Sequence, residues 1–463
     1  MSSVSASTKY EESHKKMTVF AYRVCKKRSF RFFSEIGKGV FLISMNPFLS
    51  IRGGNPLCGE VPIGGMKNAA LPILFATILI RGKTVIENLP PVSDIEITLR
   101  ILETMGAVVR REDTTTVQID ATHADPDAIP VGLTTRLRAT SYLLGAGLGR
   151  FGRVRIGIPG GCDFGNRPLD QHFKVLSVLG AESHLCSDCI EVSSSHGLRG
   201  ATVRLDFPSV GATVNGILAA VTASGTTVID NAAKEPHIVD LAAFLNACGA
   251  EIDGAGTSRI CIDGVKTLHG CRHRVVPDMI EAGTYLAAVA GTGGKLCVCS
   301  VVPEHLDAVI DKLTAMGVSV GIESDRITAT RDKPLCGTEI QTLPYPGFPT
   351  DMQPQFAPLL CLATGGGRIC ECVWNDRFRY ASELRRMGAT IAVNGRCATF
   401  RGNDRLVGTH VAATDLRAGA AMLIAGLCAE GTTTVSQLHH IERGYPDFLN
   451  KFRNVGADIS RFC

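Results

Sequence analysis

The sequence has little that would place it in a membrane, and its composition excludes several other classes of protein. Its longest apolar run, residues 69–80, is too short to span a bilayer and contains Pro72. Charged residues make up 20% and apolar residues 45% of the 463 positions, which excludes a disordered chain, a collagen and a coiled coil. Seventeen cysteines are too sparse for a disulfide scaffold, and many lie in strand-like runs such as 297–299 and 370–372. Cysteine there is typical of a small reduced core residue, so we expect a cytoplasmic protein without a membrane partner.

Several catalytic and binding motifs are also missing. The sequence has no P-loop and no nucleophile elbow, and Cys186-Ser-Asp-Cys189 has no second Cys-x-x-Cys or histidine pair at zinc spacing. The glycines at 145, 147 and 149 lie inside an apolar helical segment and not after a strand, which argues against a dinucleotide site. We therefore expect no metal and no cofactor.

Positive charge is concentrated at the start of the chain. Residues 1–44 contain nine lysines and arginines against three glutamates, a net charge of +6, so the remaining residues carry a net charge of −2. This segment, which lacks structural patterning, is either a transit peptide or sequence upstream of a true start at Met45, and we favour the second interpretation. The net positive charge of the whole chain therefore does not indicate nucleic-acid binding.

One sequence motif recurs six times along the rest of the chain. An apolar helical stretch ends in Gly followed by Ala or Val, with glycines at positions 106, 180, 249, 317, 388 and 456. The spacings are 74, 69, 68, 71 and 68 residues, so six units fill the chain from about residue 45 onward.

Each unit is predicted to read helix, strand, helix, strand. In the first unit Ile95, Leu99, Leu102 and Met105 share one helical face, with Ser93 as the expected N-cap and an alternating strand over 107–111. Gly-initiated strands are expected at 82–88, 225–231 and 431–436, each after a small-residue helix such as 68–79 or 415–429. Helices without a polar face are normally buried. We therefore expect helices inside and sheets outside, in two three-unit domains divided near residues 272–276.

Charged residues stand where these apolar helices begin. Asp278, Asp351 and Asp415 can be explained as helix caps. Capping does not explain the cations Lys67, Arg138 and Arg417, because the positive end of the helix dipole disfavours them. A third helix begins at Ser209-Val210-Gly211, whose backbone N–H groups are free to meet an anion.

A glycine-rich loop and two further loops add reactive or cationic groups. Cys162 lies between glycines and near Arg167, and neighbouring positive charge favours the reactive thiolate. Arg377 and Arg443 occupy equivalent loops of units five and six, where the alternative is an ordinary solvated arginine. Together with Arg167 and the three cations at the helix starts they make six, which indicates a highly anionic substrate.

Seven motifs follow one another between about residue 45 and the C-terminus. They are Lys67-Asn-Ala-Ala-Leu-Pro72, Pro159-Gly-Gly-Cys162, Arg167-Pro168, Ser209-Val-Gly-Ala-Thr213, Pro349-Thr-Asp351-Met-Gln353, Thr414-Asp-Leu-Arg417 and Arg443-Gly-Tyr445. In this order they resemble the motifs of the UDP-N-acetylglucosamine enolpyruvyl transferases of the EPSP synthase superfamily. The resemblance implies an inside-out α/β barrel of two three-repeat domains, residues 67–274 and residues 45–66 plus 275–463. It also implies transfer of enolpyruvyl from phosphoenolpyruvate to the sugar 3′-hydroxyl with release of phosphate. This is the first committed step of peptidoglycan synthesis, which links the family to cell-wall biogenesis, cell shape and cell division and makes it the target of fosfomycin.

The resemblance also implies roles for individual residues. Asp351 would be the base and Cys162 the acid, with Lys67, Arg443 and Asp415 as further catalytic residues. Phosphoenolpyruvate would be bound by Lys67, Asn68, Arg167, Arg377, Arg417 and Arg443. The nucleotide sugar would be bound by Arg138, Arg167, Pro168, Leu169, Asp170, Gln171, Ser209, Val210, Gly211, Asp351 and Val373.

Some positions depart from the family pattern, and two alternatives stay open. Met279, Phe207-Pro208 and Trp374-Asn375 replace more frequent residues, which puts contacts to the uridine in question. The alternatives are a shikimate-pathway enolpyruvyl transferase, which lacks the Cys loop, and a catalytically silent nucleotide-sugar-binding paralogue. The oligomeric state is not predicted.

Overall fold

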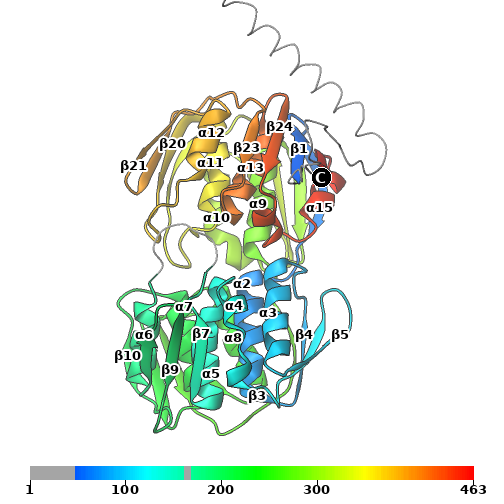
Figure 1. Cartoon of the computed structure of the whole chain (residues 1–463). Helices are drawn as coiled ribbons and strands as arrows, with labels where there is room; N and C mark the ends of the chain where they lie inside the picture. The colour runs from blue at the N-terminus through cyan, green and yellow to red at the C-terminus, as the bar shows by residue number, and fades with distance from the viewer. Residues whose placement is uncertain (1–46, 161–167, 463) are drawn as a thin grey trace, which may run out of the picture. The chain divides into compact units, whose positions relative to one another are not determined.

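The computed structural model describes residues 47–160 and 168–462 (Figure 1). The predicted extension 1–44 lies outside these residues, as do Cys162 and Arg167. None of the described helices combines the length and apolar character that a bilayer-crossing helix needs.

The six recurring glycines end six helices in the same way. Each has a positive φ, between +88° and +99°, which a side chain would disfavour. The residue after each glycine donates its backbone N–H to the carbonyl five residues earlier, as Ala107 does to Leu102 at 3.0 Å and Ala457 does to Phe452 at 3.0 Å. This is the Schellman motif, and it confirms the six helix ends predicted from the repeat.

Each unit contributes to a sheet with a three-stranded antiparallel part. In the last sheet the middle strand, β1, comes from the start of the described chain. The sets are β4 (Lys83–Glu87), β6 (Val117–Asp120) and β5 (Val108–Arg111); β7 (Arg153–Gly157), β9 (Cys189–Ser193) and β8 (Glu182–Leu185); β11 (Thr226–Asp230), β13 (Arg259–Asp263) and β12 (Glu251–Asp253); β16 (Gly294–Cys299), β18 (Arg326–Arg331) and β17 (Ser319–Ile322); β20 (Thr364–Cys370), β22 (Cys397–Phe400) and β21 (Ile391–Asn394); and β24 (Thr432–Ser436), β1 (Phe48–Arg52) and β25 (Asp458–Phe462).

Five of these sheets gain a fourth strand that pairs in parallel with the first strand of the set. These strands are β15 (Arg272–Arg274), β10 (Thr202–Arg204), β2 (Leu57–Pro62), β19 (Cys336–Gln341) and β23 (His410–Ala412), and β14 (Leu268–His269) pairs separately with β3 (Ile80–Arg81). The predicted order of helix, strand, helix, strand is found in each unit, but it is incomplete. It omitted the hairpin partner and the parallel strand, because both are fixed by pairing between distant segments.

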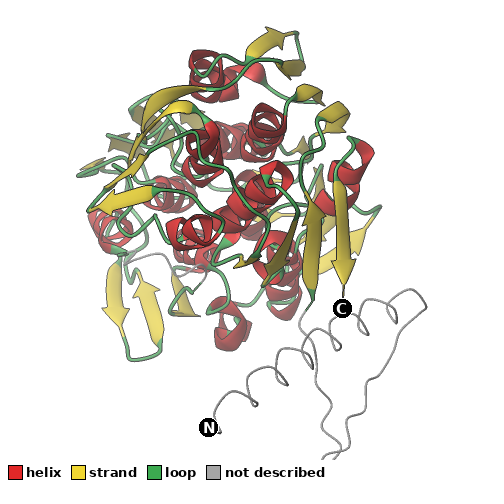
Figure 2. Cartoon of the chain, turned by 90° about the horizontal axis from the view of Figure 1, so that it is seen from above, coloured by secondary structure: helices red, strands yellow, loops and turns green. Residues whose placement is uncertain are grey.

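The small-residue helices are buried on every side, as predicted from their lack of a polar face. They are α2 (Lys67–Ala76) with the 3₁₀ turn η1 (Thr77–Leu79), η3 (Arg138–Tyr142) with α5 (Leu143–Phe151), α7 (Val210–Ala220), α9 (Met279–Thr292), α11 (Gln353–Leu362) and α13 (Leu416–Cys428). Among them α5 packs on α7, and α9, α11 and α13 pack on one another. Figure 2 shows helices toward the middle of the view and many strands toward its rim.

A second helix in each unit ends at the Gly turn. These are α3 (Ser93–Thr104), α6 (Asp170–Val178), α8 (Pro236–Ala247), α10 (Asp307–Ala315), α12 (Tyr380–Arg386) and α15 (Phe448–Asn454). Shorter helical elements are the 3₁₀ turns η2 (Pro126–Ala128) and η4 (Pro303–Leu306) and the four-residue helices α4 (Val131–Thr134) and α14 (His439–Glu442).

Close packing explains the glycines inside α5. A Cβ added at Gly145 would lie 2.5 Å from the carbonyl oxygen of Asn215 in α7, and one at Gly149 would lie 2.8 Å from that of Leu218. These glycines lie inside α5, as predicted, and they let two helices approach.

Two local predictions need correction. Ser93 does not cap α3: it is the first helical residue, and no side chain caps that end. The interpretation of cysteine as reduced is wrong for Cys370 and Cys397, which the structure joins as a disulfide between paired positions of β20 and β22. Two cysteines that are distant in sequence face each other only after the strands pair, so sequence runs could not reveal the bond.

Candidate active site

Helix starts position several of the charged residues singled out from the sequence. Asp415 caps α13, accepting hydrogen bonds from the backbone N–H groups of Arg417 and Ala418 at 2.9 and 3.0 Å. Asp278 caps α9 in the same way. The cap holds the first turn of α13 and therefore the Arg417 backbone.

Asp351 is not a cap, which corrects one of the two interpretations offered for it. Helix α11 begins at Gln353, and its N-cap position is Met352, without a side-chain cap. The Asp351 carboxylate instead accepts from Arg377 Nη2 at 2.7 Å and from Arg417 Nη2 at 2.8 Å. The Arg377 and Arg417 side chains are only 2% and 6% exposed, so neither is a solvated surface arginine.

A second carboxylate binds two more of the predicted cations. Asp94 accepts from Lys67 Nζ at 3.1 Å and from Arg443 Nε at 2.8 Å, and its side chain is 4% exposed. Burial opposes its ionisation, but Lys67 and Arg443 together outweigh burial and hold the pKa of Asp94 below its usual value. Asp94 is therefore an anion whose charge is matched by two cations.

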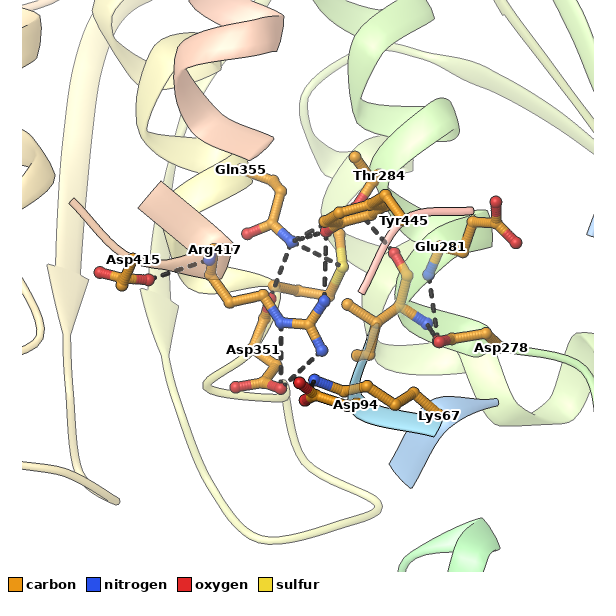
Figure 3. A network of polar contacts seen from close by, with 12 residues as sticks. Lys67, Asp94, Asp278, Glu281, Thr284, Asp351, Gln355, Asp415, Arg417 and Tyr445 are labelled. Carbon is orange, nitrogen blue, oxygen red and sulfur yellow. Dashed lines mark hydrogen bonds and ion pairs between the residues drawn. The ribbon is translucent and has the colours of Figure 1, made fainter. Parts of the chain in front are cut away.

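The two ion-pair clusters are electrostatically coupled. Burial again works against ionisation of Asp351, and the positive charges of Arg417, Arg377 and Lys67 hold its pKa well below the ordinary range. Figure 3 shows Lys67 and Asp94 next to Asp351 and Arg417. Four of the predicted cations thus converge on two neighbouring carboxylates.

Tyr445 fixes the Arg417 guanidinium from the other side (Figure 3). Its hydroxyl oxygen accepts from Arg417 Nη1 and from Gln355 Nε2, each at 3.3 Å. Thr284 lies 2.9 Å away and already donates its own proton to the Ile280 carbonyl, so Tyr445 donates to Thr284. The hydroxyl protons of Thr284 and Tyr445 in this buried network therefore each have one assigned direction.

The residues expected to bind the nucleotide sugar lie around the starts of η3, α6 and α7. Arg138 Nη2 donates to the Pro168 carbonyl at 3.4 Å, and Gln171 bonds both the side chain and the backbone of Asp206. Ser209 caps α7 by accepting from the backbone N–H of Ala212 at 3.4 Å.

The neighbouring positions complete this second group. Gly211 lies against the ring of His172, where a Cβ would come within 2.5 Å. Leu169 and Asp170 begin α6. Helix α2, which starts at Lys67, contacts η3, which starts at Arg138.

Two predicted positions stand apart from these contacts. Val373 follows β20, and its backbone N–H donates to Glu371 at 2.9 Å. Asn68 lies in the first turn of α2 and is half-buried. Among the departures from the family pattern, Phe207 is 51% exposed, whereas Met279 is buried as the first residue of α9.

Sequence reasoning missed Asp94. A signal for it existed, since Asp94 shares the buried face of α3 with Thr98, Ile101 and Met105, at helical spacings of four, seven and eleven. An acid on a buried face requires a cation, and Lys67 and Arg443 supply it.

One cluster among the described residues has the composition of a metal site. A ligand atom from each of Cys186, Cys189 and Glu191 lies within 4.8 Å of the other two, at the hairpin of β8 and β9. None of these residues belongs to either ion-pair cluster.

Comparison of the sequence with known proteins identifies its family. Residues 51–452 match the family model of EPSP synthase (3-phosphoshikimate 1-carboxyvinyltransferase). The UDP-N-acetylglucosamine 1-carboxyvinyltransferase of Clostridium botulinum is 47% identical over 414 residues, which are 89% of this chain and 99% of that protein. UDP-N-acetylglucosamine 1-carboxyvinyltransferase 3 of Caldanaerobacter subterraneus is 49% identical over 411 residues, 89% of this chain and 98% of that protein.

Solved structures share the fold. The enolpyruvyl transferase NikO from Streptomyces tendae superposes with a TM-score of 0.82 at 29% identity, covering 90% of this chain and 99% of that one. The EPSP synthase of Acinetobacter baumannii gives 0.67 at 18% identity over 90% of this chain and all of that chain, which is a likeness of fold alone. The mixed α/β fold described above is thus the fold of enolpyruvyl transferase structures.

Proposed function

Since this chain belongs to the EPSP synthase family, and within it to the UDP-N-acetylglucosamine 1-carboxyvinyltransferases, we propose that it transfers the enolpyruvyl group of phosphoenolpyruvate to the 3′-hydroxyl of UDP-N-acetylglucosamine. Phosphate is the second product. The reaction commits the sugar to peptidoglycan synthesis, and with it to cell-wall growth and division. We place it in the cytoplasm, where such charged substrates are used.

The observation that carries this proposal is the pairing of four cations with two carboxylates. Lys67 and Arg443 bind Asp94, and Arg377 and Arg417 bind Asp351. Each carboxylate occupies the position that a substrate anion would take. Guanidinium groups suit phosphate and carboxylate well, because they donate two parallel hydrogen bonds.

The two clusters fit the two anionic ends of phosphoenolpyruvate. We assign its phosphate to Lys67 and Arg443, with Arg167 as a third donor, and its carboxylate to Arg377 and Arg417. Fixed cations in a site of low dielectric constant stabilise the charge that moves toward the leaving phosphate.

Asp351 serves as the base only after its arginines are engaged elsewhere. With Arg377 and Arg417 bound to it, its pKa is too low for a strong base. When the substrate carboxylate takes over these arginines, the Asp351 pKa rises toward its ordinary value. The Asp351 carboxylate can then accept the 3′-hydroxyl proton while the hydroxyl oxygen attacks C2 of phosphoenolpyruvate.

Cys162 supplies the other proton in this scheme. It protonates the methylene carbon C3 as the new C2–O bond forms, which gives a tetrahedral intermediate. Loss of phosphate from C2 and of a proton from C3 then restores the enol ether.

The sugar nucleotide would lie against the starts of η3, α6 and α7. Arg138, the 167–171 turn, Ser209, Val210, Gly211 and Val373 would line it. The arrangement that joins this group to the ion-pair clusters would be an inside-out α/β barrel of two three-unit domains, and the pairing of β1 with β24 and β25 supports assigning residues 45–66 to the second.

The test is phosphate release with defined substrate pairs. We expect release with phosphoenolpyruvate plus UDP-N-acetylglucosamine and none with phosphoenolpyruvate plus shikimate 3-phosphate. Release with the second pair alone would make the chain a shikimate-pathway enzyme. Nucleotide-sugar binding without release would make it a silent paralogue.

A further inference from the structure

A buried carboxylate at the end of β20 links two segments of the proposed site. Glu371 follows β20 directly and is 1% exposed. None of the bonds described above joins either of its oxygens to a residue of the two ion-pair clusters. The proposed mechanism gives Glu371 no role. Its contacts are nevertheless with Thr350, next to Asp351, and with the start of the loop that leads to Arg377.

One oxygen of this carboxylate holds the loop that leads to Arg377. Glu371 Oε1 accepts from the backbone N–H groups of Val373 at 2.9 Å and Trp374 at 3.0 Å. The same oxygen accepts from Thr342 Oγ1 at 2.8 Å, just beyond the parallel neighbour strand β19. The loop of residues 373–377 is therefore tied at its start.

The other oxygen holds the segment that carries Asp351. Glu371 Oε2 accepts from Thr350 Oγ1 at 2.9 Å. Because Thr350 directly precedes Asp351, this bond limits where the Asp351 backbone can move. A single side chain thus spans the segments that supply Asp351 and Arg377.

The Glu371 backbone is itself held in place. Its N–H donates to the Arg396 carbonyl at 2.8 Å, and the preceding Cys370 is joined to Cys397. Arg396 in turn donates through Nε to Asn375 Oδ1 at 2.9 Å, within the same loop. The carboxylate therefore projects from a fixed support and can set a distance.

We propose that Glu371 is a positioning residue that sets the separation between Asp351 and the 373–377 loop. This inference rests on the proposed function, since it takes Asp351 as the base and Val373 as part of the nucleotide-sugar site. It adds a residue that acts on the reaction without touching either substrate.

The length of the side chain matters more than its charge in this role. Glutamine has the same reach: its oxygen can accept from Val373 and Trp374 while its NH₂ group donates to the Thr350 hydroxyl, which can rotate to accept. Aspartate keeps the charge but is one methylene shorter, so it cannot hold both segments. We expect Glu371→Gln to keep kcat/KM within about threefold of wild type, and Glu371→Asp to lower it about 10- to 100-fold, the range for losing hydrogen bonds to a charged group.

Thr350 offers a matched pair of variants for the Asp351 side of the link. Thr350→Ser keeps the hydroxyl, and Thr350→Val keeps the shape but loses it. We expect Thr350→Val to lower kcat about tenfold while Thr350→Ser does not. The KM for UDP-N-acetylglucosamine should change little in Thr350→Val, because the 373–377 loop stays tied, whereas Glu371→Asp should raise KM and lower kcat together.

Hydrogen exchange tests the same link without turnover. In Glu371→Ala the amides of Val373 and Trp374 should exchange faster than in wild type, and in Thr350→Val they should not. Thermal unfolding of each variant shows whether it is folded.

The outcomes separate the two proposals. Wild-type kcat and KM in Glu371→Asp, or equal damage in Glu371→Gln and Glu371→Asp, would overturn the positioning role. A wild-type protein without enolpyruvyl transfer would instead refute the proposed function. Unchanged exchange of the Val373 and Trp374 amides in Glu371→Ala would by itself refute the positioning role of Glu371.

Discussion

Replacing Asp94 by asparagine should have two opposite effects, a less stable ligand-free protein and tighter binding of inorganic phosphate. Asp94 attracts Lys67 across 3.1 Å and Arg443 across 2.8 Å. At an effective dielectric constant of about 20, each attraction is about 5–6 kcal/mol before the cost of desolvation. Removing one partner of a fully buried pair costs about 3–5 kcal/mol, and since Lys67 and Arg443 keep 12% and 20% exposure we expect about 2–3 kcal/mol.

The gain in phosphate affinity follows from competition. In the wild type, phosphate must displace the Asp94 carboxylate from Lys67 and Arg443, whereas asparagine offers no charge to displace. Recovering even 1.4 kcal/mol would tighten the Kd about tenfold. Urea unfolding measures the first effect and isothermal titration with phosphate the second.

An exposed acid provides the control for this variant. Asp311→Asn removes the same charge from an exposed position of α10 and should change neither quantity. Because the folded pKa of Asp94 is lowered from 3.8, its stabilisation is present above that value and is lost as the pH falls through the folded pKa. Phosphate binding that is equal or weaker in Asp94→Asn would show that Asp94 orients the cations and does not compete with the substrate.

Three further predictions address the proton-transfer groups and the pH dependence of stability. Asp351→Asn should lower the steady-state rate of phosphate release by about 10²–10⁴-fold, the usual contribution of a general base, with the fold retained by circular dichroism; a near-wild-type rate would remove the base assignment. Cys162→Asp should keep turnover, since a carboxylic acid can donate a proton, but should resist alkylation by fosfomycin, which mass spectrometry of the intact protein would reveal. Burial lowers the pKa of His237 from 6.5 to about 4, so between these pH values the unfolded chain binds a proton that the folded protein does not. The free energy of unfolding is therefore fully retained above pH 6.5 and decreases as the pH falls toward 4. Between pH 7.5 and 5 the free energy of unfolding should fall by about 2 kcal/mol more in wild type than in His237→Asn, and equal slopes would contradict the assignment.

The repeat and its turns could be predicted because their causes are local. A glycine at C′ of a helix is recognised from the helix before it and the strand after it, and all six were found. Strand pairing has no such local cause. Strand β1 completes a sheet with β24 and β25 from the far end of the chain, and the Cys370–Cys397 bond depends on the register of β20 with β22.

The cations of the site could be predicted for a similar reason, and their partners could not. Lys67 and Arg417 stand out because they lie at helix starts that disfavour positive charge. Asp94 lies in a first helical turn, where acids are common, so its burial and its bond to Arg443, 349 positions away, are visible only in the folded chain. Asp351 was singled out correctly as a site candidate, but its alternative reading as a cap was wrong because its carboxylate turns to two arginines.

The most direct measurement is a crystal structure with phosphoenolpyruvate and UDP-N-acetylglucosamine bound, using a slow variant such as Asp351→Asn. We expect Lys67 and Arg443 to contact the phosphate group and Arg377 and Arg417 to contact the carboxylate. Phosphoenolpyruvate bound elsewhere, with both Asp94 ion pairs intact and no arginine of either cluster touching it, would contradict the idea that these carboxylates hold the place of substrate anions.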